Sequence, residues 1–145
     1  MEKQQQLIIY TDGGSRGNPG PAAAAFIIFD FKNNLVDQKG FYLGKATNNV
    51  AEYSAVEEAM KWLLLNKVKF GKITVVFKLD SLLAVSQLNG SYKIKNLVLK
   101  QKIINIKNLE HKLGLSVIYS HISRADNKLA DCLVNEVLNK YLVGK

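Results

Sequence analysis

Carboxylate side chains stand at four positions where an isolated acidic residue is unfavourable. The chain has only 12 acidic residues among its 145, so the position of each is informative. Asp12 and Asp80 each directly follow an apolar stretch of strand length, which places them at the ends of two predicted strands. Glu52 shares a helical face with Val56, and Asp131 borders the apolar face of a predicted closing helix. Those two helical faces should meet the sheet, so we expect all four carboxylates near one edge of it.

Converging carboxylates indicate a site for divalent cations. Without enough nearby arginine they would repel one another strongly, unless a cation supplies the missing positive charge. Ligands that are all oxygen, with no cysteine pair, favour Mg²⁺ or Mn²⁺ over Zn²⁺ or copper. Such ions retain water and bind phosphate, as in phosphodiester hydrolases that use two metal ions. Taken singly, each residue also fits a structural role: an Asp at a strand end caps a turn, and Glu52 pairs with Asn49 as a helix capping box.

A glycine-rich segment and a histidine accompany the predicted acidic site. The segment 13–20 (GGSRGNPG) matches neither the Walker nor the dinucleotide-binding pattern, and a plain hairpin loop is also rich in glycine. Beside Asp12, however, its backbone groups would approach a sugar-phosphate chain closely. His121 precedes Asp131 by ten residues, on a loop that must approach the predicted site. An imidazole there would transfer protons or assist product release.

The charge balance favours a polyanionic partner. Twenty basic residues against 12 acidic ones give a formal net charge of +8, which is typical of proteins that bind nucleic acid. Six lysines accompany a single glutamate between residues 91 and 112. We predict phosphate contacts there, at Lys93 and Lys95 in particular; a solvated helix face is an equally good reading of the same pattern.

The elements that must position these residues follow from apolar periodicity. Strands are expected at 6–11, 22–30, 35–44, 72–79 and 115–120. Helices are expected at 49–66, 81–90, 96–112 and 126–142. The order βββαβααβα predicts an α/β fold with one mixed five-stranded sheet flanked by helices. If the first and fourth strands are parallel neighbours, Asp12 and Asp80 lie at the same edge of that sheet.

We interpret residues 1–145 as a single domain whose first five residues are frayed. The one cysteine, Cys132, excludes an intrachain disulfide and fits a reducing compartment, so the cytoplasm is the expected location. No apolar run approaches the roughly 18 residues that span a bilayer, and no secretory signal is evident. We therefore expect no membrane association and a monomer without an obligate protein partner.

Four segments resemble the sequence blocks of the type 1 ribonuclease H family, in that family's usual order. They are TDGGSRGNPG around Asp12, TNNVAEYSAVEEAM around Glu52, KLDSLLAVSQLNG around Asp80 and HISRADNKLAD ending at Asp131. The resemblance implies the ribonuclease H-like fold and endonucleolytic hydrolysis of the RNA strand of RNA–DNA hybrids by two metal ions, giving 5′-phosphate and 3′-hydroxyl products. It also implies that metal ions are bound by Asp12, Glu52, Asp80 and Asp131, and that His121 corresponds to the family's loop histidine. The residues that would contact the hybrid are Gly13, Ser15, Asn18, Thr47, Asn48 and Asn49.

The sequence also departs from parts of that family. The short connection NGSYKIKN stands where some members have a long basic protrusion, and we expect no separate hybrid-binding domain. Binding should therefore be weak and sensitive to salt, and it should depend on Arg16, Lys93 and Lys95. Alternatives are a nuclease of the same fold that cuts double-stranded RNA, a domain split from a reverse transcriptase, a nucleic-acid-binding module that cuts nothing, and a structural subunit of a larger complex.

Overall fold

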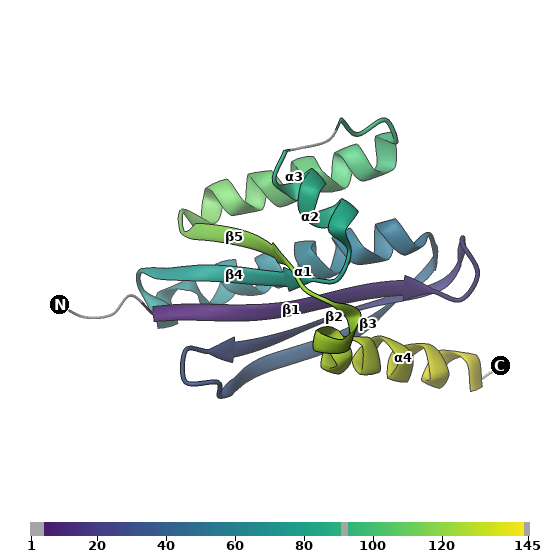
Figure 1. The fold of residues 1–145 in the computed structure, drawn as a ribbon, viewed down its shortest axis with the longest axis horizontal. Coiled ribbons are helices and arrows are strands. Elements are labelled where there is room, and N and C mark those ends of the chain that lie inside the picture. The colour runs from purple at the N-terminus through teal and green to yellow at the C-terminus, as the bar shows by residue number, and fades with distance from the viewer. Residues whose placement is uncertain (1–4, 91–92, 144–145) are drawn as a thin grey trace.

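One five-stranded sheet organises the molecule, with helices on both of its faces (Figure 1). The computed structural model describes residues 5–90 and 93–143. Its strands are β1 (Gln5–Ser15), β2 (Gly20–Asp30), β3 (Leu35–Ala46), β4 (Ile73–Leu79) and β5 (Ser116–His121). Its helices are α1 (Asn48–Phe70), α2 (Leu82–Leu88), α3 (Leu97–Leu113) and α4 (Lys128–Val143), with one 3₁₀ turn, η1 (Arg124–Asn127), before α4. The predicted order of strands and helices is confirmed.

The strand order in the sheet is β3-β2-β1-β4-β5. The first three strands form antiparallel neighbours, whereas β4 runs parallel to both β1 and β5. The β1–β4 pairing ends at Tyr10 opposite Lys78. Asp12 and Asp80 each stand two residues beyond this last pair, so the topology brings them to one edge of the sheet as predicted.

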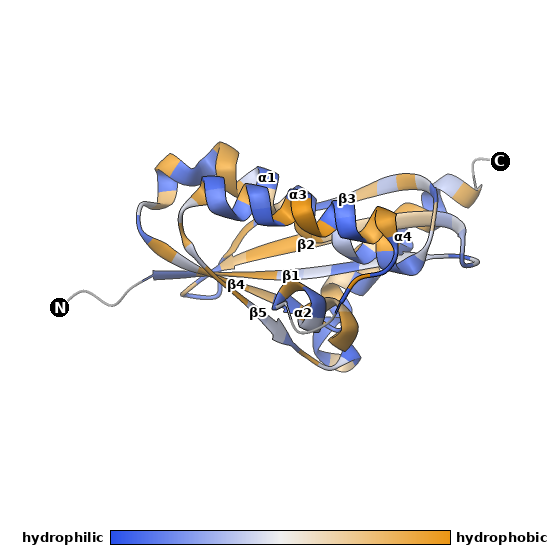
Figure 2. Ribbon diagram, turned by 90° about the horizontal axis from the view of Figure 1, so that it is seen from above, coloured by the Kyte–Doolittle hydropathy of each residue, from blue (hydrophilic) through white to orange (hydrophobic). Residues whose placement is uncertain are grey.

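Two cores of unequal size hold the helices against the sheet. The larger core lies between the sheet and α1, α2 and α3, and alternate strand residues such as Ile9 and Phe77 enter it. The smaller core lies under α4, where Val134 and Leu138 pack on Ala23 and Ala25 of β2. Figure 2 shows apolar residues along the strands and mixed apolar and polar residues around α1 and α3. None of the described helices combines the length and apolar character needed to cross a bilayer.

Strand β1 is longer than the sequence predicts at both ends. Gln5, expected to fray, pairs with Ile73 of β4; the other four residues of the expected frayed end, 1–4, lie outside the described residues. At the other end β1 continues to Ser15, because β2 offers main-chain partners as far as Ala22, the residue opposite Ser15. The first part of the predicted glycine loop is therefore strand, and Asp12 lies within β1 rather than at its end.

The N-terminal cap of α1 differs from the prediction. Thr47 caps α1, since its side chain accepts a hydrogen bond from the Val50 backbone N–H at 3.2 Å. The predicted capping box of Asn49 with Glu52 is therefore wrong. Helix α1 also runs to Phe70, past its predicted end, because Phe70 still packs against the larger core. Ser81 and Asn96 cap α2 and α3.

Candidate metal and nucleic-acid site

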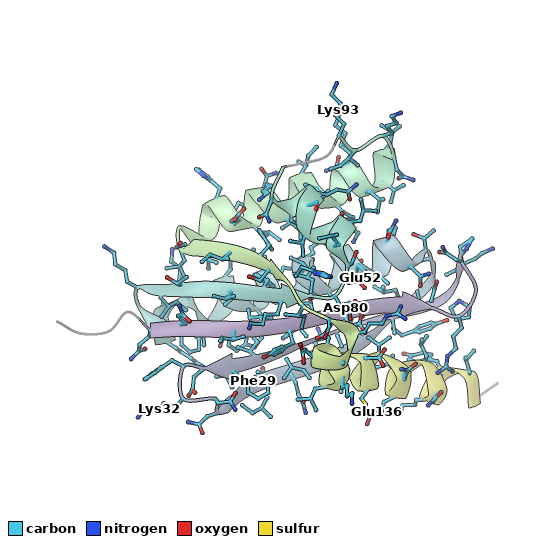
Figure 3. The ribbon with its side chains drawn as sticks, viewed as in Figure 1. Phe29, Lys32, Glu52, Asp80, Lys93 and Glu136 are labelled. Atoms are coloured by element: carbon cyan, nitrogen blue, oxygen red, sulfur yellow. The ribbon has the colours of Figure 1, made fainter. Side chains whose placement is uncertain are left out.

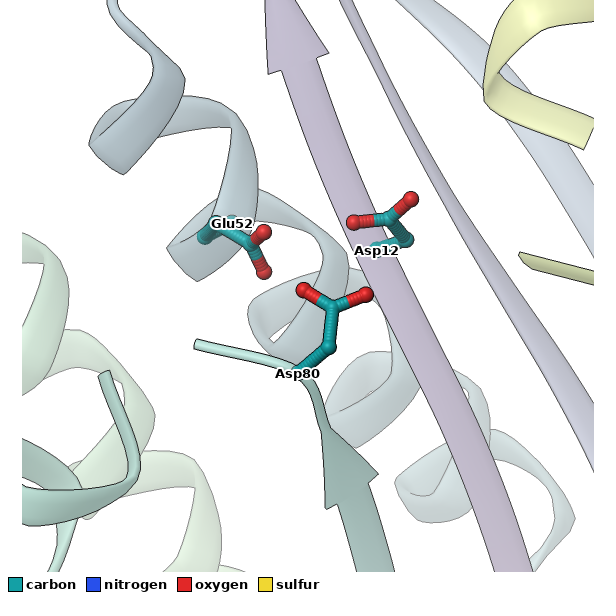
Figure 4. Close-up of side chains that lie close together, drawn as sticks. All are labelled: Asp12, Glu52 and Asp80. Carbon is teal, nitrogen blue, oxygen red and sulfur yellow. The ribbon is translucent and has the colours of Figure 1, made fainter. Parts of the chain in front are cut away.

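Three carboxylates converge where β1, β4 and α1 meet. Asp12 lies on β1, Glu52 lies on α1, and Asp80 directly follows β4. Figure 4 shows the three carboxylates facing one another. One oxygen from each lies within 4.8 Å of the others. Asp12 and Glu52 are buried, with 7% and 8% of their surfaces exposed, and Asp80 is half-buried. The structure thus brings together three of the four predicted metal-binding residues.

The close approach of α1 to β1 depends on Gly13. A Cβ atom placed on Gly13 would lie 2.5 Å from the Glu52 backbone nitrogen and closer still to the Ala51 carbonyl group. Side-chain atoms do not approach a backbone this closely, so only glycine allows the contact. The missing side chain at residue 13 therefore places Glu52 beside Asp12.

Burial and mutual repulsion make the charged form of this cluster unfavourable. Burial raises the pKa of Asp12 to about 7, and the negative charge of Asp80 raises it too. Burial also raises the pKa of Glu52 well above its usual value, with further contributions from Asp12 and Asp80. The ion pairs found in the described part of the chain do not involve these three residues.

The cluster fits a hard divalent cation. The Glu52 Oε2 atom is buried and has no hydrogen-bond partner among the described residues, which is unfavourable and which a bound cation would compensate. Its fellow ligands are carboxylate oxygens, which Mg²⁺ and Mn²⁺ accept readily. A bound cation would also relieve the repulsion that raises the pKa values of Asp12 and Glu52.

A hollow of about 450 Å³ opens beside the cluster. Asp131 lines it from α4, but this side chain is exposed and stands outside the three-carboxylate cluster. The remaining lining residues include a run from the β1–β2 hairpin, the first turns of α1 and one face of α4: Gly13, Gly14, Ser15, Arg16, Asn48, Asn49, Ser81, Arg124, Val134, Asn135 and Leu138. Its wall is therefore largely polar, as a site for a charged substrate requires.

Hydrogen bonds of asparagine side chains connect the residues at the rim of the hollow. Asn48 Oδ1 accepts hydrogen bonds from the Ser15 backbone N–H at 2.9 Å and from the Ser15 hydroxyl at 3.1 Å. The Asn48 backbone N–H in turn donates to Asn18 Oδ1 at 3.0 Å. Asn18 and Thr47 do not line the hollow in the described structure; they support the residues that do, by tying the hairpin to α1 and by capping α1.

Arg16 occupies the rim but is already engaged. Its Nη2 atom donates to Asn139 Oδ1 at 2.6 Å and to Asn135 Oδ1 at 3.5 Å. These bonds link the β1–β2 hairpin to α4. The predicted phosphate contact of Arg16 stays a prediction, and it would require the guanidinium to share its donors with α4.

Three other predicted residues lie away from the hollow. His121 is the last residue of β5, opposite Leu79, rather than a loop residue, and it is not among the described residues that line the hollow. Lys93 and Lys95 are exposed, and Figure 3 shows Lys93 at the far side of α2 and α3 from the labelled carboxylates. Arg124 of η1 does line the hollow, and it was not predicted because its turn follows no periodic pattern.

Comparison with known proteins decides the family. The family model described as RNase H matches residues 4–139. The chain belongs to the RNase H family. The predicted resemblance and the predicted fold are both confirmed.

Relatives within the RNase H family cover most of this chain. Ribonuclease HI of Halobacterium salinarum is 35% identical over 130 residues, which are 90% of this chain and 63% of that protein. The bifunctional protein Rv2228c of Mycobacterium tuberculosis is 33% identical over 136 residues, which are 92% of this chain and 36% of that protein. The chain therefore spans less than two thirds of the length of these relatives.

A solved RNase H structure is closely similar. The crystal structure of LC11-RNase H1 in complex with an RNA/DNA hybrid is 41% identical and superposes with a TM-score of 0.89. The match covers 94% of this chain and 99% of the LC11 chain. The sheet and its helices are thus those of an RNase H protein over nearly the whole chain.

Proposed function

We propose that this protein is a ribonuclease H that hydrolyses the RNA strand of RNA–DNA hybrids. The observation that carries the proposal is the buried cluster of Asp12, Glu52 and Asp80 beside a polar hollow, in a chain of the RNase H family. The similar LC11-RNase H1 was crystallised with an RNA/DNA hybrid, which supports the same substrate class here. The net charge of +8 favours a polyanion as well.

The carboxylates of this chain would hold the catalytic cations. Asp12, Glu52 and Asp80 form the inner cluster, and Asp131 reaches the same hollow from α4. We propose Mg²⁺ as the cofactor, with Mn²⁺ as a substitute; when bound, such cations activate water for in-line attack and stabilise the departing 3′-oxygen. The products would carry 5′-phosphate and 3′-hydroxyl ends.

The walls of the hollow would place the hybrid. Ser15, Asn48 and Asn49 offer neutral hydrogen-bonding groups next to the acidic cluster, where a 2′-hydroxyl can both donate and accept. Arg124 brings a guanidinium to the same hollow and suits a phosphate oxygen. His121 would act in proton transfer or product release only if its side chain reaches the substrate from the end of β5.

A cleavage assay tests the proposal directly. Labelled RNA–DNA hybrid, duplex RNA, duplex DNA and both single strands would be incubated with the protein in Mg²⁺, in Mn²⁺ and in EDTA. We expect RNA cleavage in the hybrid alone, dependent on the divalent cation. Cleavage of matched duplex RNA at a similar rate would favour the double-stranded RNA nuclease, and binding without cleavage would favour the non-cutting module. The monomeric state and the cytoplasmic location stay predictions.

A further inference from the structure

A buried asparagine links the elements that carry the acidic residues. Asn127 ends η1 and exposes only 1% of its surface. Its Nδ2 atom donates one hydrogen bond to the Thr11 carbonyl oxygen at 2.9 Å and another to Asp80 Oδ2 at 3.0 Å. The side chain therefore joins β1, the end of β4 and the start of α4 at one point.

The chemistry of its partners fixes the orientation of this amide. A backbone carbonyl and a carboxylate both accept hydrogen bonds, so the amide nitrogen rather than the amide oxygen must face them. The remaining atom, Asn127 Oδ1, is buried without a hydrogen-bond partner among the described residues. Burying an unpaired acceptor is unfavourable, and an apolar side chain would fill the same space without that cost. Packing alone therefore does not explain an asparagine at this position.

Each contact of Asn127 bears on an acidic residue. Thr11 immediately precedes Asp12 in β1, Asp80 is itself a member of the cluster, and Asn127 lies four residues before Asp131. The bond to Asp80 Oδ2 restricts rotation of that carboxylate about its side-chain bonds. The bond to Thr11 fixes the main chain of β1 just beyond the point where its pairing with β4 stops.

The turn that carries Asn127 is itself well anchored. The Ile122 backbone N–H donates to the Leu79 carbonyl at 2.8 Å and so extends the β4–β5 ladder up to the residue before Asp80. Ser123 caps η1 by accepting from the Asp126 backbone N–H at 3.3 Å, and its hydroxyl donates to the Asp126 carboxylate at 3.0 Å. These hydrogen bonds hold the turn that carries Asn127 in place, which a residue that orients another side chain requires.

We propose that Asn127 is a positioning residue of the acidic site, whose side-chain amide holds the Asp80 carboxylate and the main chain next to Asp12 in the arrangement that binds divalent cations. This inference rests on the proposed function, because it assigns Asn127 to the metal site of that activity. Partners that hydrogen-bond a metal-binding carboxylate orient its oxygens and tune their affinity for the ion. Asn127 itself neither binds the cation nor contacts the substrate.

Three variants separate positioning from packing. Asn127→Ala removes both hydrogen bonds and leaves a small void. Asn127→Asp keeps the volume but replaces both N–H donors with a carboxylate that repels Asp80. As the matched control, Asn105→Ala removes an equivalent bond from an asparagine Nδ2 to a carboxylate, the 3.2 Å contact with Glu57 between α3 and α1.

The main readout is Mg²⁺ affinity, measured by calorimetry on the full chain without substrate. We expect Asn127→Ala to weaken Mg²⁺ binding by about ten- to hundredfold, and Asn127→Asp to weaken it at least as much. At a fixed Mg²⁺ concentration below the wild-type dissociation constant, kcat on the hybrid should fall by a similar factor, while KM for the hybrid changes by less than about threefold. Asn105→Ala should lower Tm but leave Mg²⁺ affinity within about twofold, because its bond lies outside the metal site.

The outcomes are distinguishable. If the wild-type protein binds Mg²⁺ and cleaves the hybrid, but Asn127→Ala and Asn127→Asp match it in affinity and kcat, the positioning role is overturned and the proposed function stands. If the wild-type protein neither binds Mg²⁺ nor cleaves, both proposals fail together. Asn127→Ser retains one hydroxyl donor and covers the case in which the other variants do not fold. It should bind Mg²⁺ more weakly than wild type, and wild-type affinity in this variant would overturn the inference.

Discussion

Asp12 and Asp80 lie side by side because β1 pairs with β4, whereas Ser15 and Asn48 at the rim of the hollow are held by bonds between exposed groups. The acidic cluster is thus positioned by main-chain geometry, and the contact at Gly13 adds Glu52 to it. Ser15 still pairs with Ala22 of β2, but its bonds to Asn48 can be removed without changing the pairing of β1 with β4. Changes in the cluster should therefore alter kcat or folding, and changes at the rim should mainly alter substrate affinity.

The substitution Asp80→Asn is the strongest test of the acidic cluster. The amide keeps the shape of the side chain but removes a charge needed to hold cations, so kcat should fall by at least about a thousandfold, or about 4 kcal/mol of barrier. Hybrid binding should change little. Single-turnover cleavage at saturating Mg²⁺ measures the effect, with Glu136→Gln on the exposed face of α4 as a charge-matched control. Turnover within about tenfold of wild type would remove Asp80 from the metal site.

Gly13→Ala tests whether backbone approach builds the cluster. The added methyl group would meet the main chain of α1 at Ala51 and Glu52, so the strand and helix must separate. We expect a loss of about 1–3 kcal/mol in the free energy of unfolding, together with a fall in kcat as Glu52 moves away.

Urea titration measures the stability effect, and Gly14→Ala is the natural comparison for it. A Cβ at residue 14 meets only ordinary contacts, at 3.9 Å from Asn48 Oδ1 and 4.0 Å from Val134 Cγ1. Equal destabilisation by both substitutions would contradict the argument for Gly13.

The acidic cluster also predicts how stability depends on pH without metal. The pKa of Asp12 is raised from 3.8 to about 7 in the folded protein. Below about pH 4 the carboxyl group is therefore protonated in both the folded and the unfolded chain, and it does not lower the free energy of unfolding. As the pH rises from about 4 through 7, the unfolded chain releases its proton more readily, and the folded state loses stability. The raised pKa of Glu52 acts in the same direction.

Melting temperatures in EDTA at a series of pH values measure this loss. Asp80→Asn should melt higher than wild type near pH 8, and its stability should fall less steeply with pH, because Asp80 contributes to both raised pKa values. Adding Mg²⁺ at pH 8 should stabilise wild type more than the variant. Identical pH profiles for wild type and Asp80→Asn would mean that Asp80 does not interact with Asp12 and Glu52.

Asn48→Ala tests the rim. It removes the acceptor for the Ser15 backbone N–H and hydroxyl, so the hairpin should lose its fixed position over the hollow. If substrate binding must restore the lost order at a total cost of about 0.5–1.5 kcal/mol, KM for the hybrid should rise by about three- to tenfold, with kcat nearly unchanged. Steady-state kinetics separates the two constants. A drop in kcat as large as that of Asp80→Asn would place Asn48 with the cluster instead.

The smallest effect is expected from replacing Lys93 and Lys95 with alanine. Both side chains are exposed and do not line the hollow in the described structure, so kcat should be unchanged. If both contact phosphates, the slope of log affinity against log salt should flatten by about one to two units, at roughly 0.7–0.9 per contact. Affinity measured across a salt series in the Asp80→Asn background decides this. An unchanged slope would show that these lysines face solvent.

Sequence reasoning succeeds where a local pattern reports burial. Apolar runs of strand length predicted the strands at Asp12 and before Asp80, and helical spacing predicted the face of Glu52. These patterns are set by which side of an element meets the core, so a single chain reveals them. The order of the elements predicted a mixed sheet, in which the two aspartates share one edge if the first and fourth strands are parallel neighbours.

The features that escaped prediction depend on contacts between distant residues. β1 continues through Ser15 because β2 supplies partners for it, which no pattern within residues 12–15 indicates. Arg124 of η1 lines the hollow, whereas His121 at the end of β5 does not, and only the folded chain determines that difference. Asn127 likewise has no signature in the sequence, since its two partners lie 116 and 47 residues away.

The run of four alanines in β2, residues 22–25, has no exposed surface and lies between the helices on the two faces of the sheet. Ala23 and Ala25 underlie Val134 and Leu138 of α4, and Ala24 lies opposite Gly13, the residue that touches α1. Short side chains here let both helices lie near the sheet, so the thickness of this layer sets how far Asp131 stands from the carboxylates on the strands. Enlarging Ala25 to valine would lift α4 and move Asp131 away from the cluster of Asp12, Glu52 and Asp80, although no acidic residue had been altered.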